Sequence, residues 1–495
     1  MTAADASTLP GVEDLGSRRV LPLVINGVPV LTADVRDLPS RDDRGPVRRV
    51  AFADPALAAQ AAGVASLARG QCASSTRAER SRVLRGMADA LERDAEGFAI
   101  SLVREVGKTV RDARGEVARS VSTLRAAADA VGTLIGTEVP VDSVDVGHDR
   151  VAYTMWQPIG VVLAICGFNF PLLLAVHKLS AAIGAGCPIL IKPSERTPFT
   201  TVALGRVAVD SGWPAAAISV INGGPEVGSC LTADPHVALV SFTGSSLVGA
   251  RIAAAAGASL KRVVLELGSN AATIVAQDAD LDLAVARCAV GGMSTAGQSC
   301  ISVQRIIVHR DVEAAFRDRL AERLRELRTG DPADEQTDVG RLVADQETTR
   351  VRALIDDAVG SGGVLVTGPG NGPHLEPTLV AHVPETARMA QEEVFGPVVA
   401  TFSYSDDADA VRLANSTAYG LMAGVFTSSL DRALYFAEHI EAGGVHINDS
   451  SNFRPDNIPY GGVKASGVGK EGPGWAMREF SNEKIVTLRR PGGVS

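Results

Sequence analysis

The sequence predicts an α/β fold with a largely parallel sheet. Short apolar runs, typical of buried strands, alternate with segments of helical period along most of the chain. At 495 residues the chain is too long for a single hydrophobic core, so two or three domains are expected. The composition, 46% hydrophobic and 21% charged residues, is that of an ordinary globular protein.

The clearest strand and helix signals lie in the first half of the chain. Apolar runs predict buried strands at 160–165, 188–191, 238–242 and 263–267. Helical spacing of apolar residues predicts helices at 81–110, at 114–135, from Leu172 to Gly184-Ala185-Gly186, and from Ser245 to Ala256. This alternation is that of successive βα units.

The pattern restarts after Gly268, where we place a domain boundary. Asp278 and Asp280 can cap a helix that runs towards Ala296, because aspartate accepts hydrogen bonds from the free N–H groups of a first helical turn. A strand is expected at 303–308, and further βα units follow between 311 and 426.

The bulk properties exclude several classes of partner. A formal net charge of −9 gives no reason to expect nucleic acid or an anionic membrane. No apolar run reaches the ~18 residues of a membrane span. The first sixteen residues lack the basic and apolar regions of a secretory signal, so we expect a flexible tail over 1–19 and a cytoplasmic protein. Six scattered cysteines fit neither a disulfide framework nor a zinc site, and we expect no metal.

Three polar residues form the main candidate for a catalytic site. Cys300 follows Gly297-Gln298-Ser299, Glu266 lies in Leu265-Glu266-Leu267-Gly268, and Asn169 lies far upstream. A thiolate attacks a carbonyl, a carboxylate can deprotonate the thiol or a water, and an amide N–H can stabilise an oxyanion. Together they could take an aldehyde through a covalent thioester, although a lone cysteine is usually a small buried hydrophobe.

Two segments are candidates for nucleotide binding. The strand, Thr-Gly-Ser turn and helix at 239–256 fit phosphate binding, because a helix N-terminus presents free N–H groups, but the segment could equally be an ordinary turn. It is not the GxGxxG fingerprint. Lys192 and Glu195 at the end of a neighbouring strand could hold ribose hydroxyls, or could belong to a solvated loop.

The chain resembles the aldehyde dehydrogenase superfamily from Ile25-Asn26-Gly27 to Lys484. The motifs that carry the resemblance occur in family order: Gly167-Phe168-Asn169-Phe170-Pro171, Lys192-Pro193-Ser194-Glu195, Phe242-Thr243-Gly244-Ser245, Leu265-Glu266-Leu267-Gly268, Gly297-Gln298-Ser299-Cys300, Glu392-Glu393-Val394-Phe395-Gly396-Pro397, and Pro459-Tyr460-Gly461-Gly462-Val463-Lys464-Ala465-Ser466-Gly467.

The resemblance implies a role for each of these segments. Cys300 would be the nucleophile, Glu266 the general base, and the Asn169 amide with the Cys300 N–H the oxyanion hole. The cofactor-binding residues would be Lys192 and Glu195 on the adenosine ribose, Ser245 with Phe242 and Gly244 at the pyrophosphate, Gly268 above the thiol, and Glu393 and Phe395 at the nicotinamide.

The resemblance also implies three parts of the fold. A doubly wound, Rossmann-like cofactor domain would comprise 20–138 and 156–267, a catalytic α/β domain 268–470, and a small β oligomerisation arm 139–155 and 471–495. Strands of the arm would add to a partner's sheet, because a bare strand edge invites pairing. A homodimer or homotetramer is therefore expected, with a small-molecule aldehyde as the other partner.

The expected substrate is a small polar aldehyde with a hydroxyl or an anionic group. Leu267–Asn270 and Ile301–Arg305 resemble the subgroup that acts on lactaldehyde and on phosphonate- or sulfonate-bearing aldehydes. Departures from the family are Cys166-Gly167, which adds a second thiol, and a histidine at 177. Candidate substrate residues are His177, Arg119, Ser451, Asn452, Phe453 and Arg454. Alternatively, Arg454 pairs with Asp456 and Arg119 forms a surface ion pair.

We expect oxidation with NAD rather than NADP, because Glu195 would repel a 2′-phosphate, although Lys192 could soften this. One alternative is acyl transfer from the same thioester to coenzyme A or phosphate, against which Glu266 argues. Another is a non-catalytic protein on the same fold, against which the intact Cys300, Glu266 and Asn169 argue.

Overall fold

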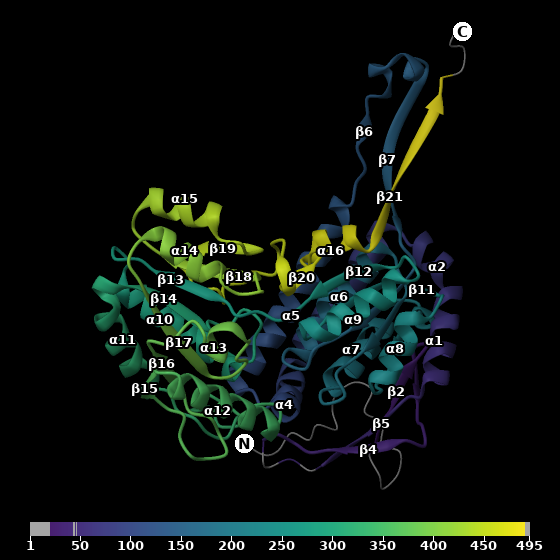
Figure 1. Cartoon of the computed structure of the whole chain (residues 1–495). Coiled ribbons are helices and arrows are strands. Elements are labelled where there is room, and N and C mark those ends of the chain that lie inside the picture. Colours follow the sequence, from purple (N-terminus) through teal and green to yellow (C-terminus); the bar gives the residue numbers. More distant parts are fainter. Residues whose placement is uncertain (1–19, 43–44, 46, 491–495) are drawn as a thin grey trace.

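The computed structural model describes residues 20–42, 45 and 47–490. The tail predicted at 1–19 and the last residues of the predicted arm, 491–495, lie outside the described residues. Two lobes, each built on a mostly parallel sheet, lie side by side, and a β arm projects from one of them (Figure 1).

The first lobe is built on an eight-stranded sheet with the order β20-β12-β11-β8-β9-β10-β2-β3. Its parallel centre consists of β12 (Arg262–Glu266), β11 (Val237–Thr243), β8 (Val161–Ile165), β9 (Ile189–Lys192) and β10 (Ile218–Val220). Antiparallel strands complete the edges: β2 (Leu23–Ile25), β3 (Val28–Val30) and β20 (Gly467–Val468). The strand order reverses direction between β8 and β11, and such a point is where open α/β sheets bind ligands.

The second lobe is built on a seven-stranded sheet with the order β15-β16-β17-β14-β13-β18-β19. Its strands are β13 (Ala272–Val275), β14 (Arg305–His309), β15 (Val364–Thr367), β16 (Thr378–Ala381), β17 (Val398–Tyr404), β18 (Met422–Phe426) and β19 (Gly444–Ile447). All pairings are parallel except that of β15 with β16.

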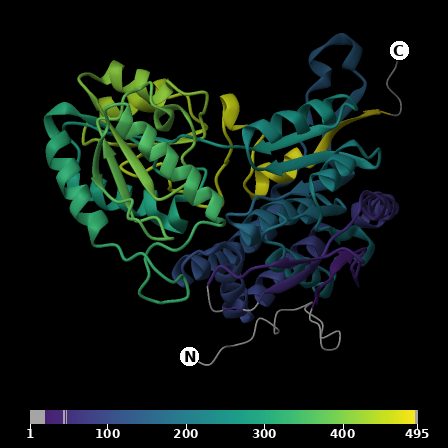
Figure 2. The same cartoon turned by 60° about the horizontal axis from the view of Figure 1, so that its bottom comes forward.

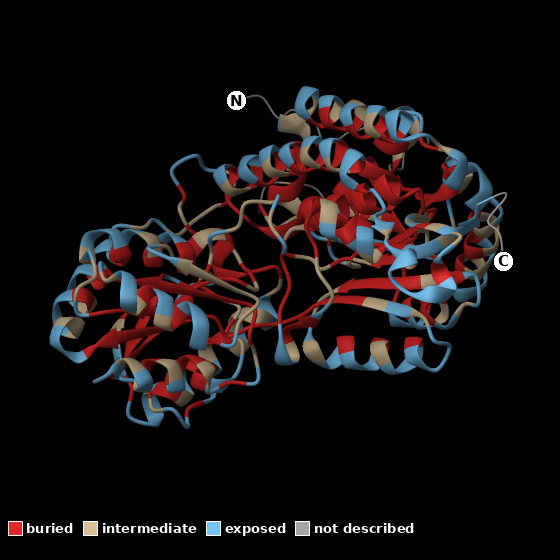
Figure 3. Ribbon diagram, turned by 90° about the horizontal axis from the view of Figure 1, so that it is seen from above, coloured by how far each residue is buried: buried red, intermediate tan, exposed pale blue. Residues whose placement is uncertain are grey.

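Helices cover the sheets and turn their exposed residues outward, while the central strands are buried (Figure 3). The first lobe carries α1 (Pro55–Leu67), α2 (Arg69–Ser74), α3 (Arg77–Arg93), α4 (Ala95–Val106), α5 (Val110–Ala130), α6 (Pro171–Ala185), α7 (Phe199–Asp210), α8 (Pro225–Ala233), α9 (Ser246–Gly257) and α16 (Pro473–Glu479). The second carries α10 (Leu281–Met293), α11 (Arg310–Arg325), α12 (Asp345–Gly360), α13 (Arg388–Gln391), α14 (Asp407–Asn415) and α15 (Leu430–His439).

The chain crosses between the lobes near its end and then enters the arm. The segment that contains β20 lies between the two lobes (Figures 1 and 2). The arm is an antiparallel sheet of β21 (Ser481–Arg489), β7 (Arg150–Pro158) and β6 (Glu138–Val139). A smaller sheet of β1 (Val20–Leu21), β5 (Arg48–Ala51) and β4 (Val35–Leu38) flanks the first lobe.

The structure confirms most predicted elements and corrects three. The helix predicted at 81–110 is two helices, α3 and α4, which break at Asp94. Gly107, with φ +83°, then ends α4 in the left-handed conformation that favours glycine. The helix predicted at 114–135 is α5, which begins and ends earlier.

The third correction concerns the start of the second lobe. Asp280 caps α10 as predicted, but Asp278 binds Thr427, Ser428 and Arg432 instead. This helix stops at Met293 rather than near Ala296, because the chain turns sharply there. The division of the chain into cofactor, catalytic and arm segments stays a prediction.

Candidate active site

The candidate site is a cavity of about 500 Å³ between the two lobes. From the first lobe, the segments that follow β8, β11 and β12 line it; from the second, the loops around Cys300, Glu393 and Arg454 do. The carboxyl ends of the parallel strands on both sides of the switch point therefore open into this cavity.

A strained turn places Cys300 in the cavity. Thr295 and Ala296 have φ near +50°, and a Cβ on Gly297 (φ +69°) would lie 2.0 Å from the Gly396 carbonyl oxygen. Only glycine fits at 297, and positive φ values in other residues persist where the surroundings enforce them. One such contact is Thr295 N–H, which donates to Asp112 Oδ2 at 2.9 Å.

The surroundings of the Cys300 thiol disfavour its ionised form. Its Sγ lies 3.2 Å from the Tyr460 hydroxyl oxygen. Burial raises the pKa of the thiol to about 12, while the Tyr460 hydrogen bond and the charge of Arg454 act in the opposite direction. Because the thiolate is the nucleophile, the thiol requires a base.

Asn169 lies beside the nucleophile loop. It follows β8, and its Nδ2 donates to the Gln298 carbonyl oxygen at 2.9 Å, two residues before Cys300. The Gln298 side chain is fixed in turn, since its Oε1 accepts from Val343 N–H at 2.9 Å. The sequence-predicted nucleophile and amide thus come together in one cavity.

Glu266 ends β12 as an unpaired buried carboxylate. The residue is 3% exposed, and neither carboxylate oxygen has a hydrogen-bond partner among the described residues. Burial raises its pKa well above the ordinary value, and the negative charge of Glu471 adds to this. A carboxylate with a raised pKa can take a proton at near-neutral pH, as a general base must.

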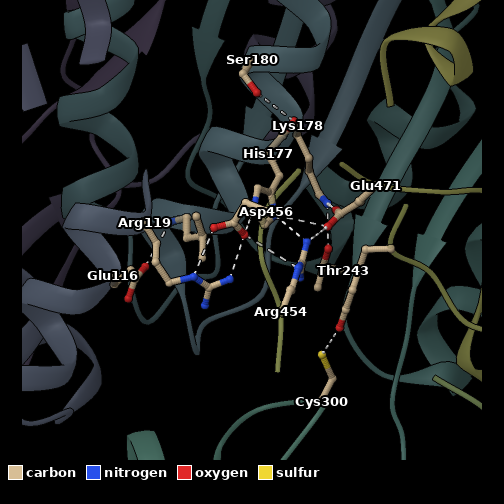
Figure 4. A network of polar contacts seen from close by, with 12 residues as sticks. Glu116, Arg119, His177, Lys178, Ser180, Thr243, Cys300, Arg454, Asp456 and Glu471 are labelled. Atoms are coloured by element: carbon tan, nitrogen blue, oxygen red, sulfur yellow. Dashed lines mark hydrogen bonds and ion pairs between the residues drawn. The ribbon is translucent and has the colours of Figure 1, made fainter. Parts of the chain in front are cut away.

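A second buried carboxylate, Glu471, has the opposite surroundings (Figure 4). Its Oε1 accepts from Lys178 Nζ at 2.8 Å, and its Oε2 lies 3.2 Å from Arg454 Nη2 and 3.3 Å from His177 Nδ1. Burial alone would raise its pKa, but Lys178, His177 and Arg454 outweigh burial and hold the pKa well below the usual range.

The network continues from Glu471 to the edge of the cavity. His177 Nε2 lies 3.3 Å from Asp456 Oδ1, and Arg119 binds both oxygens of Asp456, at 2.8 and 3.2 Å. The Arg454 guanidinium lies 3.4 Å from the centre of the Tyr460 ring. A chain of charges thus runs from Glu471 through His177 and Asp456 to Arg119, whose side chain is 36% exposed.

Glu393, Gly268 and Phe395 also line the cavity. Glu393 Oε1 accepts from Ser269 N–H at 2.9 Å, and burial raises its pKa to about 7. A Cβ on Gly268 would lie 2.7 Å from Glu393 Oε2, so the absent side chain leaves room there. Phe395 packs edge-on against Phe168, with ring centres 5.8 Å apart.

The other predicted cofactor residues divide into two groups. Gly244 and Ser245 line the cavity at the start of α9, which Ser245 caps. Phe242 does not line it: the side chain is buried in the core beneath Gly244.

Lys192 and Glu195 lie outside the cavity, at the end of β9. Lys192 is buried, and burial lowers its pKa. Glu195 Oε2 lies 3.9 Å from Arg36 Nη1, and this arginine also binds Asp34 with two hydrogen bonds. Sequence reasoning did not identify Arg36, because β4 is distant in the chain.

The predicted substrate residues also separate. Arg119, Asn452 and Arg454 line the cavity. His177 lies behind the wall, within the charged network. Two predictions find no support in the geometry: Ser451 is buried and donates to the Ile301 carbonyl oxygen at 3.0 Å, and Phe453 packs against the His446 ring.

Arg119 and Arg454 both line the cavity and both form ion pairs within the protein, so each of the two alternatives for these arginines holds in part. Arg119 is in an ion pair with Asp456, and Arg454 is chiefly paired with Glu471, its Nε lying 3.9 Å from Asp456. Cys166, the second thiol, is buried, and burial raises its pKa to about 11.

Sequence reasoning missed Lys178, Glu471, Tyr460 and Asp456 as site residues. The signal for Lys178 is a lysine within the mostly apolar helix PLLLAVHKLSAAIGA, because a buried charge needs a partner. Tyr460 lies within a quoted motif, but the sequence does not show that its hydroxyl meets the thiol.

Two other kinds of feature are absent from the described ranges. No group of three or more residues that could hold a metal ion occurs among the described residues. In the same part of the chain, no helix combines the length and the apolar character needed to cross a membrane.

Comparison with known proteins identifies the family. The model of the aldehyde dehydrogenase family matches residues 37–486. The chain is 41% identical over 412 residues to a 3-sulfolactaldehyde dehydrogenase of Priestia aryabhattai. The aligned residues cover 83% of this chain and 86% of that protein.

Two solved structures show the same fold. Aldehyde dehydrogenase 21 from Physcomitrella patens, in complex with the reaction product succinate, superposes with a TM-score of 0.93 at 34% identity, over 97% of this chain and 100% of that one. An NAD-dependent aldehyde dehydrogenase from Sinorhizobium meliloti superposes with a TM-score of 0.92 at 32% identity, over 98% of each chain. The chain therefore belongs to the aldehyde dehydrogenase family and has its fold.

Proposed function

We propose that this protein oxidises a small polar aldehyde, with a hydroxyl or an anionic group, to the carboxylic acid with NAD. The observation that carries the proposal is the convergence of Cys300, the Asn169 amide and the unpaired carboxylate of Glu266 on one cavity. These groups supply a nucleophile, an oxyanion donor and a base.

The residues around the cavity fit a dinucleotide cofactor. Ser245 at the start of α9 suits a pyrophosphate, since a helix N-terminus offers free N–H groups. The space above Gly268, which a Cβ would fill, and the neighbouring Glu393 suit the nicotinamide ribose. Bound NAD supplies the acceptor for the hydride that the aldehyde carbon loses.

The protein's own residues carry the remaining steps. Glu266 takes the proton of the Cys300 thiol, and the sulfur bonds to the aldehyde carbon. The Asn169 amide donates to the resulting alkoxide oxygen. After hydride loss leaves a thioester, Glu266 releases the thiol proton to solvent and then takes a proton from a water whose oxygen attacks the acyl carbon. The carbon–sulfur bond then breaks, the acid forms, and Cys300 leaves as thiolate.

The choice of water as acyl acceptor rests on Glu266. A buried carboxylate with a raised pKa is suited to activating a water at near-neutral pH. Acyl transfer to coenzyme A or phosphate from the same thioester would not require such a base. Addition of coenzyme A to the assay should therefore produce no acyl-CoA.

The preference for NAD rests on Glu195. Members of the family use NAD or NADP, and a glutamate near the ribose would repel a 2′-phosphate. Arg36 weakens this repulsion, but its guanidinium already donates two hydrogen bonds to Asp34. We expect a higher kcat/KM with NAD, and a shift of about tenfold towards NADP in Glu195→Ser. A wild-type preference for NADP would contradict the role of Glu195.

The substrate class rests on Arg119. Its guanidinium lines the cavity and is partly exposed, which suits contact with a sulfonate, phosphonate or carboxylate. The similarity to a 3-sulfolactaldehyde dehydrogenase and to a structure with bound succinate supports an anionic substrate.

Substrate comparison tests this proposal. We expect kcat/KM to be higher for 3-sulfolactaldehyde, lactaldehyde or succinate semialdehyde than for hexanal. Arg119→Ala should lower the value for the anionic aldehydes and leave hexanal unchanged. Arg114→Ala is the matched control, because Arg114 lies on the same helix and pairs with Glu96 and Glu335. Faster oxidation of hexanal, or equal losses on all aldehydes, would contradict the assignment.

We further propose that the protein is a cytoplasmic homodimer or homotetramer that assembles through the arm. Tyr153, Met155, Ile485 and Leu488 expose apolar side chains on β7 and β21. Exposed apolar strands favour pairing with a partner. Light scattering of Ile485→Asp should show a smaller assembly than the wild type, and an unchanged mass would contradict the arm's role.

A further inference from the structure

One face of α5 holds three segments that build the site. Asp112, Glu116 and Arg119 follow one another at helical spacing and so share a face. Asp112 accepts from Thr295 in the nucleophile turn, and Arg119 binds Asp456 in the loop beside Arg454. Glu116 binds the start of the helix that follows Asn169.

Glu116 caps the helix that follows Asn169. The residue is 1% exposed, and its Oε1 accepts from Leu172 N–H at 3.0 Å and from Leu173 N–H at 3.1 Å. These N–H groups belong to the first turn of α6 and have no partner within the helix. Because α6 begins at Pro171, the carboxylate fixes the chain immediately after Asn169.

Lys108 contacts both Glu116 and Phe170, the residue before this turn. Its Nζ pairs with Glu116 Oε2, and both side chains are fully buried. The ammonium also lies 3.9 Å from the centre of the Phe170 ring, between Asn169 and the helix. Burying two charges is costly, so such a pair is weak evidence for a purely stabilising role.

We propose that Glu116 is a positioning residue of the oxyanion hole, which fixes the Asn169 amide through Leu172 and Leu173. The inference rests on the proposed function of Asn169. An oxyanion donor must lie about 2.7–3.1 Å from the developing charge. A misplacement of about 1 Å can cost a hundredfold in rate. A loose first turn of α6 would therefore lower the rate without any change in the amide itself.

The chain offers a matched control in Glu105. This buried carboxylate caps α7 in the same manner: it accepts from Phe199 N–H, from Thr200 N–H at 3.4 Å and from Thr200 Oγ1 at 3.0 Å. The segment before α7 does not contain Asn169. Removal of the Glu105 carboxylate should therefore affect folding as removal of the Glu116 carboxylate does, but its effect on kcat should not depend on Asn169.

A double-mutant cycle with Asn169→Ala tests the inference. We expect Glu116→Ala to lower kcat for aldehyde oxidation by about tenfold to a hundredfold in the wild-type background. In the Asn169→Ala background the same change should lower kcat by less than about twofold, because residues that act as a unit are non-additive. Glu105→Ala should give the same factor in both backgrounds.

Folding and function are kept apart by two further comparisons. If Glu116→Ala does not fold, two double variants replace it. Lys108→Met/Glu116→Gln removes both charges but retains a hydrogen-bond acceptor, whereas Lys108→Met/Glu116→Leu lacks the acceptor. The variant with the acceptor should have the higher kcat only when Asn169 is present. Equal factors in both backgrounds would overturn the role of Glu116. An Asn169→Ala variant as fast as the wild type would instead refute the proposed function of Asn169.

Discussion

Glu266 and Glu471 are two glutamates of one site that differ only in their surroundings. Each is 3% exposed. Glu266 has no hydrogen-bond partner among the described residues, and burial raises its pKa, whereas Lys178, His177 and Arg454 hold the pKa of Glu471 well below its usual value. Position relative to the charged network, rather than residue type, therefore decides which carboxylate can act as a base.

The two carboxylates also act on each other. The negative charge of Glu471 raises the pKa of Glu266, and the cations that hold Glu471 ionised lie close enough to act on Glu266 as well. Arg454 is the shared partner, because it also lowers the pKa of the Cys300 thiol. The network thus favours the ionised form of Glu471 and, relative to an ordinary glutamate, the protonated form of Glu266.

The largest expected effect on activity comes from removing Cys300, the thiol on which the proposed base Glu266 acts. Cys300→Ala should abolish aldehyde oxidation, since no thioester can form, while NAD binding measured by calorimetry is largely retained. Cys166→Ala is the control and should keep its activity, because Cys166 is buried away from the cavity. Turnover in Cys300→Ala would move the chemistry to another residue.

The next effect is on stability, and the two glutamates should respond in opposite directions at pH 7–8. Glu471→Gln leaves buried cations without their partner and should destabilise the fold by about 3–5 kcal/mol. Glu266→Gln removes a buried unpaired charge and should raise the thermal midpoint. A fall in the midpoint of Glu266→Gln would contradict the unpaired state of that carboxylate.

The pH dependence of these differences follows from the direction of each pKa shift. The folded pKa of Glu266 is raised, so its ionisation destabilises the fold as pH rises above the unfolded value of ~4.3. The folded pKa of Glu471 is depressed, so its contribution is present above ~4.3 and is lost as pH falls through the folded value. Thermal unfolding of both variants from pH 4 to pH 8 should therefore show the differences growing with pH.

A smaller effect is expected in the pH profile of turnover. Because Glu266 must be ionised to act as a base, kcat should fall as pH decreases, about tenfold per unit below its raised pKa. The residual turnover of Glu266→Gln should lack this dependence. An acidic limb of the same position in both proteins would assign it to another group.

The fold and the residues that meet in the candidate site were predictable from local patterns. The strands and turns that carry Asn169, Ser245 and Glu266 follow from apolar runs and glycine-containing turns. The charged network was not predictable, because Lys178 and Glu471 are 293 positions apart and Arg119 and Asp456 are 337 apart. A sequence pattern also does not show which way a side chain in a loop points.

The most direct test of Glu266 as the base is a rapid-mixing experiment with Glu266→Gln, NAD and a good aldehyde substrate. We predict a slowed burst of about one equivalent of NADH per active site, followed by almost no turnover, because losing the base slows activation of the thiol less than activation of the water. Equal slowing of the burst and of the steady state would mean that Glu266 acts chiefly on the Cys300 thiol. Steady turnover at the wild-type rate would contradict its role as the base.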